Sequence, residues 1–515
     1  NTVIADEASM IVNNSFAHTG NLTVGGGTSG SLDVTGNAVS VAGDFTLGAG
    51  SSFGTTINSA TQDDAGSVLA TGNVSVSADS TVNVTVESFS GIADGVTYKI
   101  IDGSSGTVAL PTVTDSSTKV EFIASTAGSD LTLTTEIASA TDWFTGLTPN
   151  ASAVVGVLDD VFPADAELLG ALLDIEDQGE FQDAVESLAP DMSGAVMSAG
   201  RSASRQAAGT VTRRLADLRA ANGDNRAMSG KAAGDTTDGM SAWLQAFGST
   251  FDHDDRQNVD GYDGDTTGFS LGIDSLLQDN LRVGVAFSYA DTNIDTNNSG
   301  NRTEIETYQA SLYGNFENGP HVIDASVSYG SNDYEGTRRI NAGALSRVAR
   351  SDYDGDQITW QANYRYQMQM GDEVMMTPYV GLYYVGFDMD EYTETGAGAT
   401  NLTVTNKDYK TFETILGVSL HKSFKMSNGF VSIPEVHAAY RHEHSDDAQA
   451  NTSTFTGGGA SFSTNGFNPA NGSVNIGGSF TMYTSENFDF KASYDFETRS
   501  SYKGHSGTVN IHYSF

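Results

Sequence analysis

Residues 241–515 alternate between apolar and polar side chains in a pattern that only a sheet with two different faces can use. The connections between the alternating runs also alternate in length. Those after the second, fourth, sixth, eighth and tenth runs are short, and those after the first, third, fifth, seventh and ninth are long and polar. This asymmetry predicts a closed antiparallel barrel with tight turns at one end and elaborated loops at the other. Twelve strands are predicted, at 241–251, 266–278, 281–292, 304–317, 321–334, 355–370, 374–390, 409–425, 429–444, 472–484, 487–501 and 506–515.

The two faces of each run indicate which solvent each face meets. In the run 281–292, one face carries Leu281, Val283, Val285, Phe287 and Tyr289, and the other carries Arg282, Gly284, Ala286 and Ser288. In the run 487–501, one face carries Phe488, Phe490, Ala492, Tyr494 and Phe496, and the other carries Asp489, Lys491, Ser493, Asp495 and Glu497. A soluble barrel buries its large apolar side chains, so this pattern predicts an apolar, lipid-facing exterior around a charged interior. The run 374–390 is apolar on both faces, and its register stays open.

The final run, SGTVNIHYSF, has no turn after it. An unpaired strand edge in lipid is very costly, so we expect this run to pair with the first strand, 241–251. The residues expected to close the barrel are Val509, Ile511, Tyr513 and Phe515.

The composition narrows the class of protein further. No run approaches the ~20 apolar residues of a spanning helix, so a membrane protein with this sequence is expected to cross as a barrel. Cys is absent, which excludes disulfides and thiolate metal sites. The formal net charge of −40 makes nucleic acid an unsuitable partner.

Residues 1–137 contain much shorter alternating runs, separated by Gly, Ser, Asn and Asp. Apolar pairs two residues apart recur at a near-regular interval, at Leu22/Val24, Leu32/Val34, Phe45/Leu47 and Val82/Val84. Such a rhythm predicts a right-handed parallel β-helix, in which each coil is stabilised by stacking on its neighbours. A β-sandwich is the alternative.

Between these regions the sequence takes on helical spacing. Short helices are predicted at 165–173 and 178–188, and a longer one at about 200–221. The longer helix carries Arg201, Arg205, Arg213, Arg214 and Arg219. Its ~22 residues, at about 1.5 Å each, span roughly the 30 Å of a bilayer's hydrocarbon core, yet its arginines exclude contact with lipid.

The segments RRLADLRAANG (213–223) and MSAWLQAFGS (240–249) resemble the junction between pore helix and first strand in monomeric autotransporters of the type Va secretion class. The resemblance covers most of the chain. It implies a β-helical C-terminal part of a passenger at 1–137, a helical junction at 138–199, a pore helix and linker at 200–240, and a translocator barrel at 241–515. Tyr513 and Phe515 match the family's C-terminal assembly signal, whereas Asn510 stands where the commoner pattern has Gly.

The resemblance implies a protein of the Gram-negative outer membrane that exports its own passenger to the cell surface, with one chain per pore and no cofactor. Outer-membrane lipid, the barrel assembly machinery, periplasmic chaperones and its own passenger would be its partners. The pore helix is expected to lie in the lumen and to pair its arginines with lumen acids; an ordinary surface helix is the alternative. The candidate lumen acids are Glu413, Glu435, Asp489, Asp495 and Glu497.

No catalytic or metal site is predicted. Relatives that cleave themselves inside the pore use an Asn pair on the helix, and Gly209 and Thr210 stand at those positions here, so cleavage by that route is not expected. The acidic loop 252–265 lacks the Gly and Glu of an EF-hand, and His442 and His444 lack a third zinc ligand. Two alternatives to a secretion device stay open: a surface adhesin anchored by the barrel, and an exported enzyme whose catalytic part lies upstream of Asn1.

Overall fold

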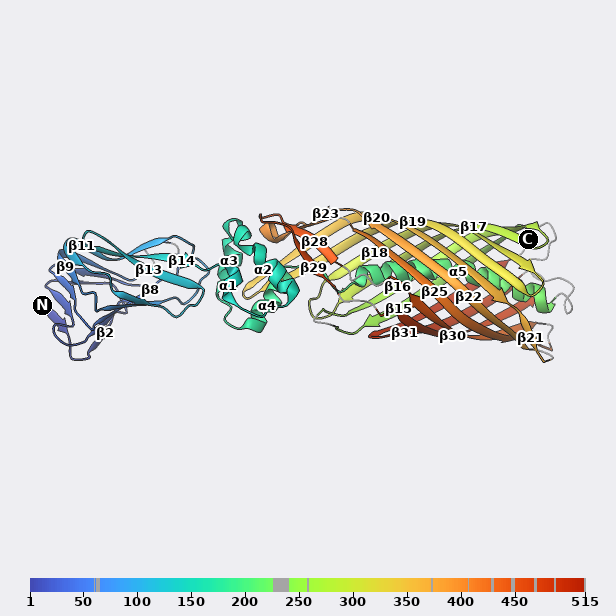
Figure 1. The fold of residues 1–515 in the computed structure, drawn as a ribbon, viewed down its shortest axis with the longest axis horizontal. Helices are drawn as coiled ribbons and strands as arrows, with labels where there is room; N and C mark the ends of the chain where they lie inside the picture. Colours follow the sequence, from blue (N-terminus) through green and yellow to red (C-terminus); the bar gives the residue numbers. More distant parts are fainter. Residues whose placement is uncertain are drawn as a thin grey trace. The chain divides into compact units, whose positions relative to one another are not determined.

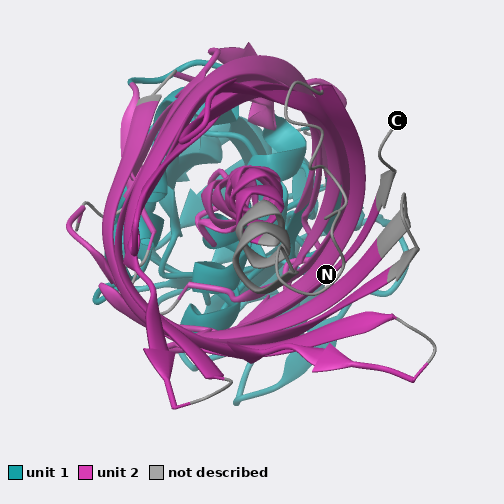
Figure 2. Ribbon diagram, turned by 90° about the vertical axis from the view of Figure 1, so that its right-hand side faces the viewer, with its two compact units in different colours: residues 1–188, 340–347, 455–460 teal, residues 189–339, 348–454, 461–515 magenta. Residues whose placement is uncertain are grey.

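A computed structural model of the chain describes all residues except 60, 62–64, 226–239, 257–258, 372–373, 406, 428–429, 446–449, 467–469, 486–487 and 514–515. It describes the backbone alone at 217–225, 407, 484–485, 488–489 and 512–513. The chain divides into two compact units, unit 1 (1–188, 340–347 and 455–460) and unit 2 (189–339, 348–454 and 461–515) (Figure 2). None of the helices in the described part of the chain is long and apolar enough to cross a membrane.

Unit 1 begins with a parallel β-helix (Figure 1). One sheet follows the order β1-β4-β7-β9-β11, a second follows β2-β5-β8-β10-β12, and β3 pairs with β6, which pairs with β9; all of these pairings are parallel. The parallel stacking matches the predicted β-helix and not the sandwich. The strands are β1 Thr2–Ile4, β2 Ser9–Ile11, β3 Phe16–His18, β4 Leu22–Val24, β5 Ser31–Asp33, β6 Ala38–Val41, β7 Phe45–Leu47, β8 Ser52–Thr56, β9 Ser67–Val76, β10 Thr81–Thr85, β11 Thr97–Val108 and β12 Thr112–Thr114.

The interior of the β-helix is dry and apolar. Leu32, Phe53 and Val82 lie one above another on neighbouring coils and are each 0% exposed. The alternation therefore buries one side chain in two, and stacking supplies the core that one coil cannot make alone. The antiparallel hairpin of β13 (Val120–Ala127) and β14 (Asp130–Ile137) pairs with β11 and ends the stack.

Four short helices follow in unit 1: α1 Ala140–Trp143, α2 Pro149–Val161, α3 Ala166–Leu173 and α4 Gln178–Ser187. Side chains preceding three of them accept hydrogen bonds from the first turn, as N-caps do. Thr148 caps α2, Asp165 caps α3 and Asp177 caps α4. The sequence placed α3 and α4 to within one residue, and it assigned no separate helix to α2.

Lys119 lies at the C-terminal end of α3 and is 5% exposed. Its ammonium group donates to the carbonyl groups of Leu172 at 3.0 Å, Leu173 at 3.2 Å and Ile175. Leu172 and Leu173 are the last two residues of α3, where carbonyls lack the usual helical partner, so the lysine acts as a C-cap and complements the helix dipole. The rings of three aromatic residues lie 5.1–5.6 Å from the ammonium: Trp143, Phe144 and Phe181.

Unit 2 is built on a closed antiparallel barrel of twelve strands, as predicted. Strands that are consecutive in the barrel pair with each other, including β20 with β22, and the barrel is closed by β15 pairing with β32, so the final strand does pair with the first. The strands are β15 Met240–His253, β16 Tyr262–Gln278, β17 Leu281–Thr296, β18 Arg302–Asn318, β19 His321–Ala342, β20 Leu345–Tyr366 with β21 Met368–Met370, β22 Val374–Met389, β25 Lys407–Lys422 with β26 Phe424–Lys425, β27 Val431–Glu443, β30 Gly472–Ser485, β31 Phe488–Arg499 and β32 Tyr502–Tyr513.

The long connections carry a small sheet of their own, in the order β23-β24-β28-β29. Its strands are β23 Tyr392–Thr393, β24 Leu402–Val404, β28 Ala450–Phe455 and β29 Phe462–Asn465, with a short 3-10 helix at Gly398–Thr400.

The two faces of the barrel follow the predicted alternation. Outward side chains are large and apolar, such as Leu312 at 58% exposed, whereas inward ones such as Gln309 at 1% are polar. On β18 the outward aromatics Tyr308 and Phe316 bracket Leu312. Eight residues at ~3.4 Å, tilted by ~40°, span roughly 20 Å, which is close to the height of an outer-membrane barrel's apolar band.

Strand β22, whose register the sequence left open, is apolar on both faces for a reason. Its inward side chains Tyr383, Val385 and Phe387 are at most 3% exposed and pack with Ala208 of α5. The outward Val380 is 40% exposed. The inner face of this strand is therefore apolar because it meets a helix and not water.

Helix α5, Ala195–Asn225, runs along the inside of the barrel (Figure 2). It begins five residues earlier than the sequence predicted. It is closest to the wall formed by β16, β17 and β18. Small side chains at Ala199, Ala203, Ala207 and Ala208, each at most 2% exposed, let the helix fit against the wall. The surface-helix alternative is wrong.

Candidate functional site

The arginines nearest the start of α5 meet a group of glutamates on the barrel wall. The Arg201 guanidinium donates to Glu443 of β27 at 2.6 Å. One turn later, Arg205 bonds both Glu413 of β25 and both carboxylate oxygens of Glu497 of β31, the latter at 3.2 Å. Charge-assisted bonds of this kind are about twice as strong as neutral ones. Three strands of the wall thus hold one helical turn.

Wall arginines complete this upper cluster. Arg441 donates to Glu497, and Arg499 lies 3.9 Å from Glu443. The guanidinium of Arg205 also lies 5.5 Å from the ring centre of Tyr383, within cation–π range. Glu443 and Glu497 are therefore each shared between the helix and the wall.

A second cluster holds α5 about two and a half turns further along. Arg214 bonds Asp274 of β16 through both Nε, at 2.8 Å, and a terminal nitrogen, at 3.1 Å. Ser241 and Arg282 also donate to Asp274, at 2.8 and 2.6 Å. The Arg214 side chain is 2% exposed and that of Asp274 is 0% exposed. This pair is thus shielded from solvent and fully hydrogen-bonded, the condition under which a buried ion pair is tolerated.

Aromatic side chains continue the lower cluster. The hydroxyl of Tyr313 donates to Asp274 at 3.0 Å and accepts from the indole of Trp243 at 2.7 Å. Val211 and Leu215 of α5 pack with these rings. The helix is therefore held here by apolar contact as well as by charge.

Arg213 points toward the opposite wall. Its guanidinium lies 4.0 Å from Asp495 of β31, which accepts a 2.7 Å bond from His437 of β27. His437 also lies 3.7 Å from Glu435. His437 and Asp495 are two strands apart, and between them β30 carries Gly477, where a Cβ would lie 2.5 Å from the imidazole. The absent side chain lets the two groups meet.

A hollow of about 260 Å³ lies between this face of α5 and the wall. Its volume is enough for roughly nine waters at about 30 Å³ each. Most of the residues that line it are charged or polar, including Arg213, Arg365, Arg441 and Lys491. One side of the helix is therefore packed dry and the other faces a polar space.

An apolar cluster, the collar, packs against the first turns of α5 from six neighbouring strands of the wall. Ala195 and Ala199 pack with aromatic and aliphatic side chains from β15 to β19 and from β32. The collar comprises Phe251, Tyr262, Ile294, Ile305, Tyr334 and Tyr502, each at most 8% exposed. It lies at the long-loop end of the barrel, beyond the upper ion pairs.

The structure brings most of the predicted site residues together. Arg201, Arg205, Arg213 and Arg214 all lie in the lumen, and Glu413, Asp495 and Glu497 lie beside them. Glu435 contacts His437 and not an arginine of α5. The side chains of Arg219, Asp489, Tyr513 and Phe515 lie outside the described residues. Val509 and Ile511 are outward, 44% and 47% exposed, on the closing strand.

Sequence reasoning missed Glu443 and Asp274, which accept hydrogen bonds from Arg201 at 2.6 Å and from Arg214 at 2.8 Å. The sequence did offer a signal for both residues, because odd and even positions along a strand face opposite sides of the sheet. Glu443 has the same parity as the predicted Glu435, and Asp274 alternates with the outward Leu271 and Ile273.

The residues weighed for other chemistry are separated in the fold. His437 faces the lumen, whereas His442 and His444 face outward with ring centres 4.8 Å apart. Within the described part of the chain, no group of three or more His, Asp or Glu is arranged to hold a metal ion. Gly209 lies under the guanidinium of Arg213, and the Thr210 hydroxyl donates to the Ala207 carbonyl at 2.6 Å.

Most of the barrel sequence matches a known family model. Residues 242–495 match the Autotransporter beta-domain. They are an autotransporter β-domain, and the barrel is an outer-membrane barrel.

Curated relatives of the β-domain chain come from several bacteria. Outer membrane protein A of Rickettsia rickettsii is 29% identical over 53% of this chain and 12% of its own length. Outer membrane protein B of Rickettsia prowazekii is 25% identical over 96% of this chain and 32% of its own length. An extracellular serine protease of Serratia marcescens is 28% identical over 43% of this chain and 20% of its own length. The chain spans a third or less of the length of each of these relatives.

Among solved structures, the translocator domain of the autotransporter NalP from Neisseria meningitidis aligns with a TM-score of 0.44 and 15% identity. The alignment covers 60% of this chain and 98% of that one.

Proposed function

We propose that the barrel anchors the chain in the outer membrane and exports its own N-terminal segment to the cell surface, after which α5 stays in the lumen as a plug. The observation that supports this most is the set of four arginines of α5, each facing a lumen carboxylate. A helix held at two heights from several strands suits a permanent occupant of the pore. Residues 1–137 would then be displayed outside.

The plug would close the pore in two layers. The apolar collar that packs against Ala195 and Ala199 excludes ions because it offers them no polar partner. The ion pairs below it fix the helix so that the collar stays complete. Removing the pairs should therefore open the pore without removing any apolar contact.

Insertion of the barrel needs partners, and we propose the barrel assembly machinery and periplasmic chaperones, with outer-membrane lipid around the apolar band. One chain closes its own twelve strands, so one chain per pore suffices. Stacking of the β-helix coils outside would help to draw the chain through.

The plug is tested by charge reversal at Arg213 and Arg214. The full chain carrying Arg213→Glu and Arg214→Glu is reconstituted in planar bilayers and its ion conductance measured. We expect conductance well above wild type, because Asp274 and Asp495 would then face new carboxylates. Conductance and thermal stability equal to wild type would contradict a seated plug.

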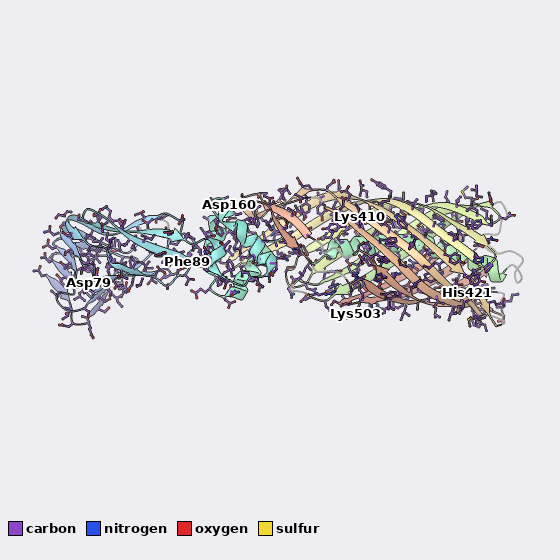
Figure 3. The ribbon with its side chains drawn as sticks, in the orientation of Figure 1. Asp79, Phe89, Asp160, Lys410, His421 and Lys503 are labelled. Carbon is purple, nitrogen blue, oxygen red and sulfur yellow. The ribbon has the colours of Figure 1, made fainter. Side chains whose placement is uncertain are left out.

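A matched control carries the same change of charge on the outside of the barrel. Lys410 and Lys503 lie on β25 and β32 toward the long-loop end, with side chains 63% and 57% exposed (Figure 3). The variant Lys410→Glu with Lys503→Glu is expected to conduct like wild type. A rise in this control would show that net charge, and not the plug, sets the conductance.

We further propose that the described chain is not itself an enzyme, and that any activity belongs to segments outside it. A displayed adhesin is the second candidate. Loss of cell binding on deleting residues 1–137, with export of a substituted passenger unchanged, would favour it. An exported enzyme is the third, favoured by the extracellular serine protease among the relatives. The coding sequence upstream of Asn1 distinguishes these two.

A further inference from the structure

The basic residues of the chain are distributed very unevenly. Residues 1–200 contain 26 Asp and Glu, two Lys and no Arg. The first arginine is Arg201, at the upper ion-pair cluster of the lumen. If the proposed export function holds, residues 1–200 cross the pore ahead of the first arginine of α5, and they carry no guanidinium group.

The carboxylates of the lumen wall can bind further arginines, whereas the bases of the wall are already paired and do not bind a passing acidic chain. The main carboxylates already have one basic partner on the wall: Arg282 for Asp274, Arg441 for Glu497, Arg499 for Glu443 and His437 for Asp495. A passing carboxylate therefore meets acids that repel it and bases that are occupied. The acids still have acceptor capacity, since a carboxylate offers about four lone-pair sites.

The arginines of α5 use this remaining capacity. Asp274 accepts Arg282 on Oδ1 and the Nε of Arg214 on Oδ2. Glu497 accepts Arg441 on Oε2 while it also bonds Arg205. A guanidinium group donates several hydrogen bonds in a fixed plane, so it can bind a carboxylate that already has one basic partner. The ammonium group of a lysine is a point charge and is less suited to this.

The arginines also act together. Arg201 and Arg214 are thirteen residues apart, which is about 20 Å along a helix. Arg205 and Arg213 lie between them and reach the same wall strand, β31. A chain that formed one such pair could slip past it, whereas four pairs at two heights must break at once for the helix to move.

We propose that Arg201, Arg205, Arg213 and Arg214 form a stop element that ends translocation, and that residues 1–200 pass the lumen because they are acidic and carry no arginine. This deepens the proposed export function and rests on it. Lys99 and Lys119 pass because each is a single ammonium far from the next basic residue.

The first experiment asks whether the helix stops in the right place. The full chain has no cysteine, so one introduced cysteine is the only thiol in the protein that a maleimide can label. Ser29→Cys reports the passenger, and Ser229→Cys reports the linker behind α5. Both are labelled in intact cells with a membrane-impermeant maleimide. In the wild-type background we expect labelling at 29 and none at 229.

The four arginines are then replaced together by Gln, with Lys at all four positions as the charge-conserving control. We expect the Gln variant to gain labelling at 229, because nothing holds the helix, and the Lys control to gain much less. Heat-modifiable migration on gels shows whether the barrel has folded in each variant. Folded barrels with no labelling at 229 in the Gln variant would overturn the stop element.

The second experiment leaves the barrel and α5 intact. Arginines are placed at four exposed positions ahead of the pore helix, by Ser152→Arg, Gly156→Arg, Glu180→Arg and Asp183→Arg, with Gln at the same positions as the control. We expect labelling at 29 to fall several-fold with Arg and to stay at the wild-type level with Gln. Equal labelling in the two would overturn the proposal. If residue 29 is unlabelled in the wild type itself, the export function fails instead.

Discussion

The β-helix of unit 1 and the barrel of unit 2 use the same two-residue alternation with opposite polarity. Inside the β-helix, Phe53 and Val82 are fully buried, and polar residues such as Asn83 face outward. In the barrel, Leu312 and Ile476 face outward, and Gln245, Asp274 and Arg282 face inward. The backbone pattern is shared, so the difference lies in which solvent each face meets.

The comparison shows that burial alone does not define the environment of a strand residue. The interior of a thin solenoid is filled by its own side chains, and it has no room for hydrated groups. The barrel encloses a helix and a polar hollow, so its interior selects hydrogen-bonded charges. A charge should therefore be severely destabilising inside the β-helix. Inside the barrel it should be tolerated when it is paired, and on the barrel's outer surface it should again be costly.

The largest effect is expected from a carboxylate in the β-helix. Val82→Asp places an unpaired charge among side chains that are fully buried. We expect unit 1 to lose about 5 kcal/mol or more, enough to unfold the neighbouring coils. Protease digestion of the full chain, followed by mass spectrometry of residues 1–137, measures the loss.

The neighbouring position gives the control. Asn83→Asp introduces the same carboxylate one residue later on the same strand, where the side chain is exposed and accepts a 2.7 Å bond from Thr114. Wild-type protease resistance is expected. If the two variants are equally resistant, the interior of the β-helix is not as dry as described.

Next in size is the loss of a paired charge in the lumen. Asp274→Asn leaves Arg214 and Arg282 close together without their carboxylate, and we expect the barrel to lose roughly 3–5 kcal/mol. The midpoint of heat-modifiable migration on gels measures this. Asp252→Asn is the control, since Asp252 lies at the exposed rim 3.8 Å from Lys503. A change in the control as large as in Asp274→Asn would contradict the special role of the buried pair.

The features that could be predicted from the sequence are those that a period of two determines. The strand spans and the closing pair of β15 and β32 follow from alternation and loop length, whereas the resemblance to autotransporters implied that the arginines of α5 lie in the lumen. The partners of each arginine do not follow from either, because they depend on the stagger of β25, β27 and β31 around the barrel. Glu443 is inward by parity, yet only the fold places it next to Arg201.

Two other features depend on tertiary contact. The inward apolar residues of β22 look irregular in the sequence because the helix they meet is about 170 residues away along the chain. Lys119 likewise gives no local signal, because its carbonyl partners lie more than 50 residues later. The periodicity of the sequence indicates which face of the sheet a residue lies on, but it does not indicate what packs against that face.

The exterior of the barrel should tolerate charge only at its rim. Leu312→Arg puts a guanidinium near the middle of the apolar band, and we expect a cost of about 2–4 kcal/mol from the lipid. Glu304→Arg on the same strand faces outward beyond Tyr308, and it should cost less than about 1 kcal/mol. Urea unfolding in lipid vesicles compares the two. Equal losses of stability in the two variants would show that the apolar band does not lie around Leu312.

The smallest effect concerns Lys119, a buried basic group of unit 1, which contrasts with the paired arginines in the lumen. Burial lowers the pKa of Lys119 to about 8, against the opposing charges of Glu176 and Asp174. Between pH 8 and its unfolded value near 10.5, the unfolded chain holds the proton more often than the folded chain does. The stability of unit 1 should therefore rise with pH in this window, by at most about 1.4 kcal/mol per pH unit.

Trp143 lies beside the ammonium and reports this unit once Trp243 and Trp360 are replaced by Phe. Its fluorescence follows unfolding of the full chain in urea between pH 8 and 9.5, below the range where tyrosines ionise. Lys119→Met removes the titrating group and should flatten the slope, while it also removes the cap of α3 and lowers stability at every pH. An unchanged slope in Lys119→Met would assign the pH dependence to another group. Lys119 is thus kept in a buried site beside α3 by three carbonyl groups and three aromatic rings, whereas the lumen holds its charges by pairing them with opposite charges.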